Sequence, residues 1–247
     1  MSKRELTLVA AAGLGGAALA IALVFSAAAF GWLPGDVSTR RYLLAHPEIL
    51  VDMSTKLQAN QNAAADNARQ AAIDRLGMKA FFDPKIAFIT GPTRAKTTLV
   101  EFFDYNCVHC RASLPAVKSY YAAHKDNTRF AFIEFPIKGD ESVFAARAAI
   151  AARKQPDKYM AFHFLMMGEQ NLVTPDLVYA DAAKAGLDVE KLKADMANSS
   201  VDLAIAAALT LAHAARIDGT PAFIVDGRSW EGEVDRKLLA KFTNTKI

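Results

Sequence analysis

The stretch that decides the fold is TTLVEFFDYNCVHCRASLP, residues 97–115, which contains both cysteines of this 247-residue chain. Its first seven residues are rich in β-branched and aromatic side chains and predict a buried strand. A short polar turn, DYN at 104–106, follows. Cys107 comes directly after this turn, at the expected start of a helix whose amphipathic pattern covers residues 111–124. The stretch therefore predicts a strand, a turn and a helix, with a C-x-x-C motif at the start of the helix.

The position of Cys107 favours a reactive thiolate. Free N–H groups and the helix dipole stabilise an anion at a helix N-terminus, so the pKa of Cys107 should fall below the ~8.5 of a free cysteine. Cys110 lies one turn further on, and we expect the exposed Cys107 to attack and the more covered Cys110 to resolve the mixed disulfide. His109, if protonated, adds a second favourable charge. Tyr105 and Arg111 are interpreted as surface residues near this site.

The C-x-x-C motif alone has two other interpretations. It is also half of many zinc sites, but the remaining histidines are scattered along the chain without metal-binding spacing: His46, His124, His163 and His213. Two small core residues would also fit the spacing, but core packing does not account for the strand-turn-helix placement. A redox pair is therefore favoured, and we expect no metal and no cofactor.

The composition is that of a globular protein, with 52% hydrophobic residues available for a core. The formal net charge is +3, and the two signs alternate along the chain, so nothing predicts nucleic-acid binding. Two cysteines cannot form a structural disulfide framework.

The N-terminal segment predicts export. Two basic residues at 3–4 precede residues 6–35, which contain no ionisable side chain, and about 20 residues of helix suffice to cross a membrane. We predict that residues 1–35 are a signal anchor, with 6–33 in the inner membrane, or a signal peptide cleaved near Ala29. Both alternatives place the remainder in the periplasm, where disulfides form and persist.

Residues 36–78 are predicted to form a helical stalk. A short helix over 38–45 and a long one over 47–76 are expected, with Gly77 ending the second. Mostly apolar residues recur every seven positions: Leu43, Leu50, Leu57, Ala64, Ala71 and Met78. The other heptad positions are largely polar: His46, Met53, Asn60, Asn67 and Asp74. The stalk is either the contact of a homo-oligomer, such as a trimer, or a solvated helix that packs loosely on its own domain.

The rest of the chain, 79–247, shows a globular pattern. Strands are predicted at 85–90, 97–103 and 128–137, and a hairpin at 221–233 followed by a helix at 234–243. Residues 138–218 between them are almost wholly helical in pattern. Strands before and after an all-helical block predict one α/β sheet domain with a helical insertion.

Four segments resemble the DsbA-type branch of the thioredoxin superfamily: VEFFDYNCVHC at 100–110, EFPI at 134–137, AARAAIAA at 145–152 and GTPAF at 219–223. The resemblance implies a thioredoxin fold with an inserted helical domain. It also implies a thiol:disulfide oxidoreductase, an oxidase or an isomerase, that acts on exported cysteine-containing proteins. A membrane redox partner would reset its thiols.

The resemblance implies roles for three further residues. Thr220 and Pro221 match the cis-proline loop that faces the active site, where Thr220 would touch the thiolate and proline brings no N–H beside the sulfur. Glu101 matches a buried acid, whose pKa burial should raise and which can exchange protons with Cys110. Many relatives carry a basic residue where this chain has Ile133, which removes a possible charge partner.

RRYLLAHPEILVDM, residues 40–53, is similar to the oligomerisation region of ScsC-type, suppressor-of-copper-sensitivity proteins. This similarity implies that several C-x-x-C sites face a common space, an arrangement that suits isomerisation, whereas a monomer suits net oxidation. The residues leave the direction open. They also leave open a copper-handling protein with Cys107 and Cys110 as soft ligands, and a scaffold in which the anchor and stalk matter more than the thiols.

Overall fold

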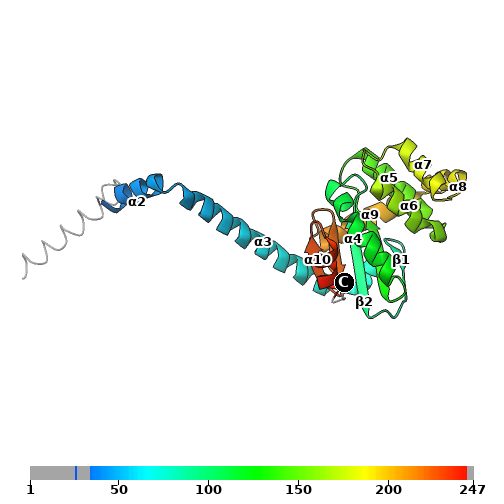
Figure 1. The fold of residues 1–247 in the computed structure, drawn as a ribbon, viewed down its shortest axis with the longest axis horizontal. Coiled ribbons are helices and arrows are strands. Elements are labelled where there is room, and N and C mark those ends of the chain that lie inside the picture. Colours follow the sequence, from blue (N-terminus) through cyan, green and yellow to red (C-terminus); the bar gives the residue numbers. More distant parts are fainter. Residues whose placement is uncertain (1–25, 27–33, 244–247) are drawn as a thin grey trace, which may run out of the picture. The chain divides into compact units, whose positions relative to one another are not determined.

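The computed structural model describes residues 26 and 34–243 (Figure 1). The chain divides into two compact units, Met1–Ala63 and Ala64–Ile247. The segment 6–33, predicted as an anchor or a cleaved signal, lies outside the described residues apart from Ser26. None of the described helices has the length and the apolar character that a membrane crossing requires.

The first unit contains helix α2, Pro34–Ala45, and the first part of helix α3, Glu48–Leu76. The sequence predicts both helices, although α2 begins at Pro34 rather than Ser38. Proline is favoured in the first turn of a helix because its missing N–H would be unpaired there anyway. The two helices are separated at His46, because the following Pro47 disfavours the helical conformation of the residue before it.

Large apolar side chains of the first unit are exposed to solvent: Tyr42, Leu43, Leu44, Leu50, Val51, Met53 and Leu57. Leu50 is 75% exposed and Leu57 is 58% exposed. Exposed apolar surface of this kind is typical of a contact with another molecule rather than of a solvated helix.

Helix α3 ends within the second unit. Gly77, with φ 72°, donates its N–H to the Ile73 carbonyl at 2.9 Å and so satisfies one of the carbonyls left free at the helix end. The short 3-10 helix η1, Met78–Phe82, follows and buries two phenylalanines. The sequence pattern does not predict η1, because so short a helix shows no period.

A five-stranded mixed sheet forms the centre of the described part of the second unit. Its strands are β1 Phe88–Thr90, β2 Thr97–Phe103, β3 Thr128–Glu134, β4 Ala222–Val225 and β5 Arg228–Glu231, in the spatial order β1-β3-β2-β4-β5. Strands β2 and β3 are parallel and every other pair is antiparallel. Helix α4, Val108–His124, makes the crossover that a parallel pair requires. The predicted α/β class is confirmed, and the topology is thioredoxin-like.

Between β3 and β4, where every residue is described, five helices form an insertion (Figure 1). They are α5 Asp140–Ala152, α6 Pro156–Gly168, α7 Pro175–Lys184, α8 Val189–Met196 and α9 Ser199–Ala214. Helix α10, Arg236–Phe242, follows β5. The sequence pattern gives no separate signal for the short α8, which Asp188 caps by accepting a hydrogen bond from the Lys191 N–H at 2.9 Å.

Different helices cover the two faces of the sheet. Side chains alternate along β2, so Leu99 and Phe103 lie on one face while Val100 and Phe102 lie on the other. The residues of the first face belong to one apolar cluster with α4, α10 and the helices α5 to α8, and those of the second face to a cluster with α9, η1 and the end of α3. By the same alternation, Glu101 lies on the face that α4 covers.

Candidate active site

Cys107 lies between the end of β2 and the start of α4. Its backbone is extended, with φ −85° and ψ 117°, and it is the residue that precedes the first turn of α4. The Cys107 carbonyl already accepts from the Arg111 N–H at 3.1 Å, while the first N–H groups of the helix have no partner within it. The local sequence therefore places the sulfur at the positive end of a helix dipole.

Asp104 fixes the turn that carries Cys107. This residue is 1% exposed, and its carboxylate accepts four hydrogen bonds: from the backbone N–H groups of Asn106 (2.7 Å), Ile137 (2.7 Å) and Lys138 (3.0 Å), and from the Ser142 hydroxyl (2.7 Å). It thereby joins the active-site turn to the segment that enters the insertion. This role of Asp104 was not predicted from the sequence. The available signal was that an aspartate in a turn often accepts a hydrogen bond from the backbone N–H two residues further on, here that of Asn106.

Both cysteines are unbonded thiols, and each residue is 1% exposed. The accessible surface does not separate the two residues, because the Thr220 carbonyl oxygen lies 3.1 Å from the Cys107 thiol, whereas Cys110 lies deeper among the surrounding protein atoms, as expected for the more covered sulfur. Their acidities differ as well. A hydrogen bond from the Cys110 thiol, aided by the Thr220 hydroxyl and the backbone of Cys110 and His109, lowers the pKa of Cys107 to about 5 against the opposing effect of burial.

Burial raises the pKa of Cys110, and its hydrogen bond to Cys107 raises it further. The motif therefore holds one thiolate and one thiol at neutral pH. Such a pair has a nucleophile ready to attack a disulfide, or to leave from one, and a second sulfur that can resolve the product.

Glu101 lies in the centre of the sheet beneath α4. The residue is 3% exposed, and its Oε2 atom has no hydrogen-bond partner among the described residues. Burial raises the pKa of Glu101 to about 8, so the carboxyl is largely neutral at pH 7. Its charge, when present, would raise the pKa of Cys110, so the two groups influence each other.

Thr220 and Pro221 lie between α9 and β4, and their peptide bond is cis. The Thr220 carbonyl accepts from the Cys107 thiol, and the buried Thr220 hydroxyl has no hydrogen-bond partner among the described residues, so it is available to donate to the sulfur once Cys107 ionises. On the far side of the loop, the Pro221 carbonyl accepts from the Gly232 N–H at 2.8 Å. Residues 113 positions apart in sequence thus meet at one sulfur.

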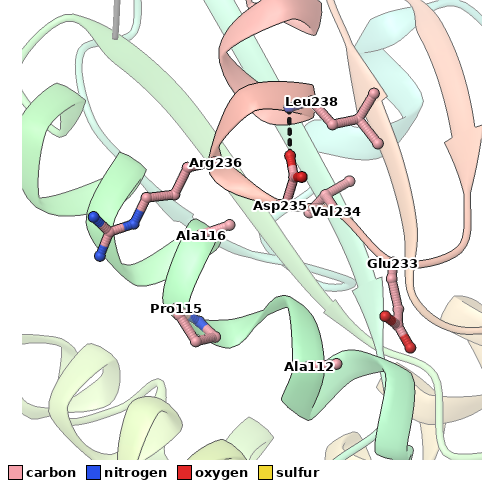
Figure 2. A pocket seen from close by; sticks show the side chains of 8 residues that line it. All are labelled: Ala112, Pro115, Ala116, Glu233, Val234, Asp235, Arg236 and Leu238. Carbon is pink, nitrogen blue, oxygen red and sulfur yellow. Dashed lines mark hydrogen bonds between the residues drawn. The ribbon is translucent and has the colours of Figure 1, made fainter.

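His109 is exposed and pairs with Glu233 through Nδ1 and Oε1. The pKa of His109 is raised, mainly by its hydrogen bond to Glu233 and further by the negative charge of Cys107. A pocket of about 400 Å³ lies beside this pair, between one face of α4 and the start of α10. Figure 2 shows its lining side chains: Ala112, Pro115, Ala116, Glu233, Val234, Asp235, Arg236 and Leu238.

Tyr105 is not the surface residue that the sequence suggested. It is 1% exposed, and its hydroxyl is hydrogen-bonded to Nδ1 of His163 at 3.1 Å. Arg111 is half-buried and donates to the Tyr105 carbonyl and to Oδ1 of Asn106, both at 3.0 Å. Burial lowers the pKa of His163 to about 3, so this ring is neutral. Sequence reasoning missed the contact because a single histidine on a helix carries no spacing signal.

Within residues 26 and 34–243, no group of three or more His, Cys, Asp or Glu side chains is arranged to hold a metal ion. The two sulfurs are accompanied by a hydroxyl and backbone N–H groups, which can donate to a thiolate, and by the Thr220 carbonyl, which accepts from a thiol. This set of groups is suited to thiol chemistry.

Family models match two parts of the chain. Residues 85–244 match the model described as Thioredoxin, and residues 40–64 match the Copper resistance protein ScsC N-terminal domain. The chain belongs to the thioredoxin family, as a DsbA-like member of that superfamily. Its N-terminal helices are similar to those of the ScsC branch.

Two curated proteins illustrate the similarity. The chain is 32% identical over 157 residues to the Na(+)/H(+) antiporter NhaA of Herminiimonas arsenicoxydans, which covers 64% of this chain and 25% of the antiporter. It is 29% identical over 138 residues to the thiol:disulfide interchange protein DsbA of Bordetella parapertussis. The aligned region covers 55% of this chain and 66% of DsbA. The chain spans a quarter of the length of the antiporter.

Two solved structures resemble the chain over most of their length. A thioredoxin-like oxidoreductase from Silicibacter pomeroyi is 38% identical with a TM-score of 0.62, over 68% of this chain and 96% of that one. Salmonella enterica Typhimurium BcfH is 27% identical with a TM-score of 0.71, over 92% of this chain and 98% of that one.

Proposed function

We propose that this chain is an exported thiol:disulfide oxidoreductase that forms or isomerises disulfides in cysteine-containing proteins of the periplasm. The observation that carries the proposal is the arrangement at Cys107: a thiol of lowered pKa at a helix N-terminus, a neutral Cys110 one turn away, and the Thr220–Pro221 loop over the sulfur. The similarity to DsbA and to a thioredoxin-like oxidoreductase supports it.

The proposed reaction has two exchange steps. In oxidation, a substrate thiolate attacks the Cys107–Cys110 disulfide at the Cys107 sulfur, and Cys110 leaves and takes up a proton. A second substrate thiolate then attacks the mixed disulfide and displaces the Cys107 thiolate, so that two electrons pass from the substrate to the pair. The lowered pKa of Cys107 means that its thiolate is stabilised as a leaving group, so the reduced Cys107–Cys110 pair is favoured. A membrane redox partner would have to reoxidise the pair.

The direct test offers the oxidised chain reduced ribonuclease, and offers the reduced chain scrambled ribonuclease. We expect catalysed recovery of ribonuclease activity in at least one of the two assays, and the faster one indicates the operating direction. The sum of free thiols should be conserved, because each substrate disulfide formed reduces one Cys107–Cys110 pair. Recovery no faster than without the chain in both assays would contradict the proposal.

Copper handling by the same two thiolates is the second candidate, and the match of residues 40–64 to a copper resistance protein's domain favours it. Thiolates are soft ligands that suit Cu(I). Tight Cu(I) binding without any disulfide turnover would support this candidate over the first.

The N-terminal regions complete the proposal. Residues 36–78 would form an oligomerisation stalk, with residues 79–247 as the catalytic domain and 138–218 as its insertion. Residues 6–33 would anchor the chain in the inner membrane or be removed near Ala29. Support for the stalk comes from the exposed apolar side chains of the first unit and from the ScsC match at 40–64.

We expect a chain that begins at Asp36 to form an oligomer, with a mass in solution at least twice that of one protomer. Replacing Leu50 and Leu57 by lysine should reduce it to a single protomer, because the charged side chains cannot be buried without a partner. Light scattering measures both masses. The matched control is Leu203→Lys on α9, whose leucine is equally uncovered at 69% exposure. A single protomer for the unsubstituted chain would refute the stalk's role.

A further inference from the structure

We infer that Arg69 and Glu231 are positioning residues for the Thr220–Pro221 loop and, through it, for the Cys107 thiolate. The inference rests on the proposed function, because it concerns how the proposed nucleophile is kept acidic. All the residues involved belong to the second unit, Ala64–Ile247. The last turns of α3 would then help to position the active-site loop in addition to ending the predicted stalk.

Glu231 holds the backbone directly before Thr220. It is the last residue of β5 and lies opposite Ala222 of β4. Its Oε1 atom accepts hydrogen bonds from the N–H groups of Gly219 at 2.8 Å and Asp218 at 3.3 Å. The Gly232 N–H, next along the chain, donates to the Pro221 carbonyl. The end of β5 therefore fixes the loop on both sides of the residue that contacts the sulfur.

Arg69 holds Glu231 in turn. Its side chain is 8% exposed although it projects from α3, and its Nη2 donates to Oε2 of Glu231. Nε donates to the Arg216 carbonyl at 3.2 Å, just beyond the end of α9, and Nη1 donates to Asp66 at 2.8 Å. With Oε2 bound to the guanidinium, Oε1 is left to the two backbone N–H groups. A planar guanidinium suits this combination, because its donors have fixed directions.

Gly219 shows how closely the carboxylate approaches the loop. A Cβ atom at this position would lie 3.2 Å from Oε1 of Glu231, tighter than an ordinary contact. A side chain here would push the carboxylate away from the Gly219 N–H. The absence of one is consistent with a site built around this hydrogen bond.

The chain of contacts ends at the sulfur. Thr220, directly after Gly219, accepts from the Cys107 thiol through its carbonyl at 3.1 Å. Its buried hydroxyl has no partner among the described residues and is available to donate to the thiolate, which lowers the pKa of Cys107. A loop that shifts when Glu231 is released would move this hydroxyl away from the thiolate. The cysteine would become less acidic although neither Arg69 nor Glu231 contacts it.

The test is Arg69→Met in the full chain, with the pKa of Cys107 read from the ultraviolet absorbance of its thiolate. We expect the pKa to rise by about one pH unit, a tenfold change in the acid dissociation constant. The reduction potential should become more negative, because the reduced form loses part of its stabilisation. Glu231→Leu should have the same effect, and Glu231→Gln a smaller one, since its amide oxygen can still accept from Gly219.

The matched control is Arg75→Met, which removes an exposed arginine from the same helix. It should leave the pKa of Cys107 and the potential as they are. If Arg69→Met lowers the melting temperature but leaves both quantities at their wild-type values, Arg69 has only a structural role and the inference is wrong. Should that variant not fold, Gly219→Ala decides instead: the same rise in pKa supports the inference, and no rise overturns it. Failure of the proposed function would appear differently, as a wild-type chain with an acidic Cys107 that turns over no disulfide.

Discussion

Replacing Cys107 by serine should abolish disulfide exchange, with a loss of at least about a thousandfold in the catalysed rate. A serine hydroxyl is almost the same size as the thiol, so the turn held by Asp104 should remain intact. It does not ionise at neutral pH, however, and it cannot form a disulfide with the substrate. The rate of ribonuclease recovery measures the loss, and the circular dichroism spectrum checks the fold.

The partner variant Cys110→Ala separates attack from resolution. Cys107 keeps its helix N-terminus and Thr220 but loses the hydrogen bond from Cys110, which is the main cause of its lowered pKa. We expect its pKa to rise and mixed disulfides with substrate to accumulate, because no second sulfur can release them. Mass spectrometry detects these adducts. Equal activity of Cys107→Ser and the wild type would remove Cys107 from the mechanism.

The second large effect concerns the pH dependence of stability. Burial raises the pKa of Glu101 to about 8 in the folded chain, from the ordinary 4.5 of an exposed glutamate. A group whose pKa is higher in the folded state contributes stability that is complete below the unfolded pKa and is lost as pH rises through the folded pKa. Between about pH 4.5 and 8, the wild type should therefore lose roughly 4 kcal/mol of unfolding free energy relative to Glu101→Gln, which cannot ionise.

The measurement is chemical denaturation of the oxidised chain at several pH values, because the disulfide removes the titration of Cys107 from the comparison. Subtracting the curve of Glu101→Gln also removes the contributions of His109 and His163, which both chains share. Parallel stability curves would show that folding does not raise the pKa of Glu101 and would contradict the prediction. Glu101→Leu should be more stable than the wild type at pH 8, since it places no carboxylate in the core.

The sequence predicted the elements whose residues carry their own signal. Alternation and β-branched residues marked β2 correctly at 97–103, and proline and glycine marked the ends of α3. The C-x-x-C motif, Glu101 and Thr220–Pro221 were identified from local patterns or from the family resemblance, and the structure brings Cys107 and Thr220 into contact.

What could not be predicted depends on tertiary contacts. Nothing local shows that Tyr105 turns inward to His163, that Glu233 reaches His109, or which carbonyl the Cys107 thiol contacts. Each of these contacts joins segments more than fifty residues apart, so the geometry of the whole sheet and insertion determines it. The contacts of Arg69 with Glu231 and Arg216 could not be predicted either, because in the sequence Arg69 is one of many polar residues on a helix expected to be solvated.

Helix α9 has a mechanical consequence. Its first half packs against α5 through Val201, Ala204 and Ile205, while its second half packs on the sheet through residues such as Ala208 and Ala212. A single uninterrupted helix therefore packs against both the insertion and the sheet, so the insertion cannot rotate relative to the sheet without moving α9. A hinge between the insertion and the sheet of the second unit is thus disfavoured. We expect the substrate to supply the adaptability, so that chains still loosely folded are accepted and compact ones are passed over.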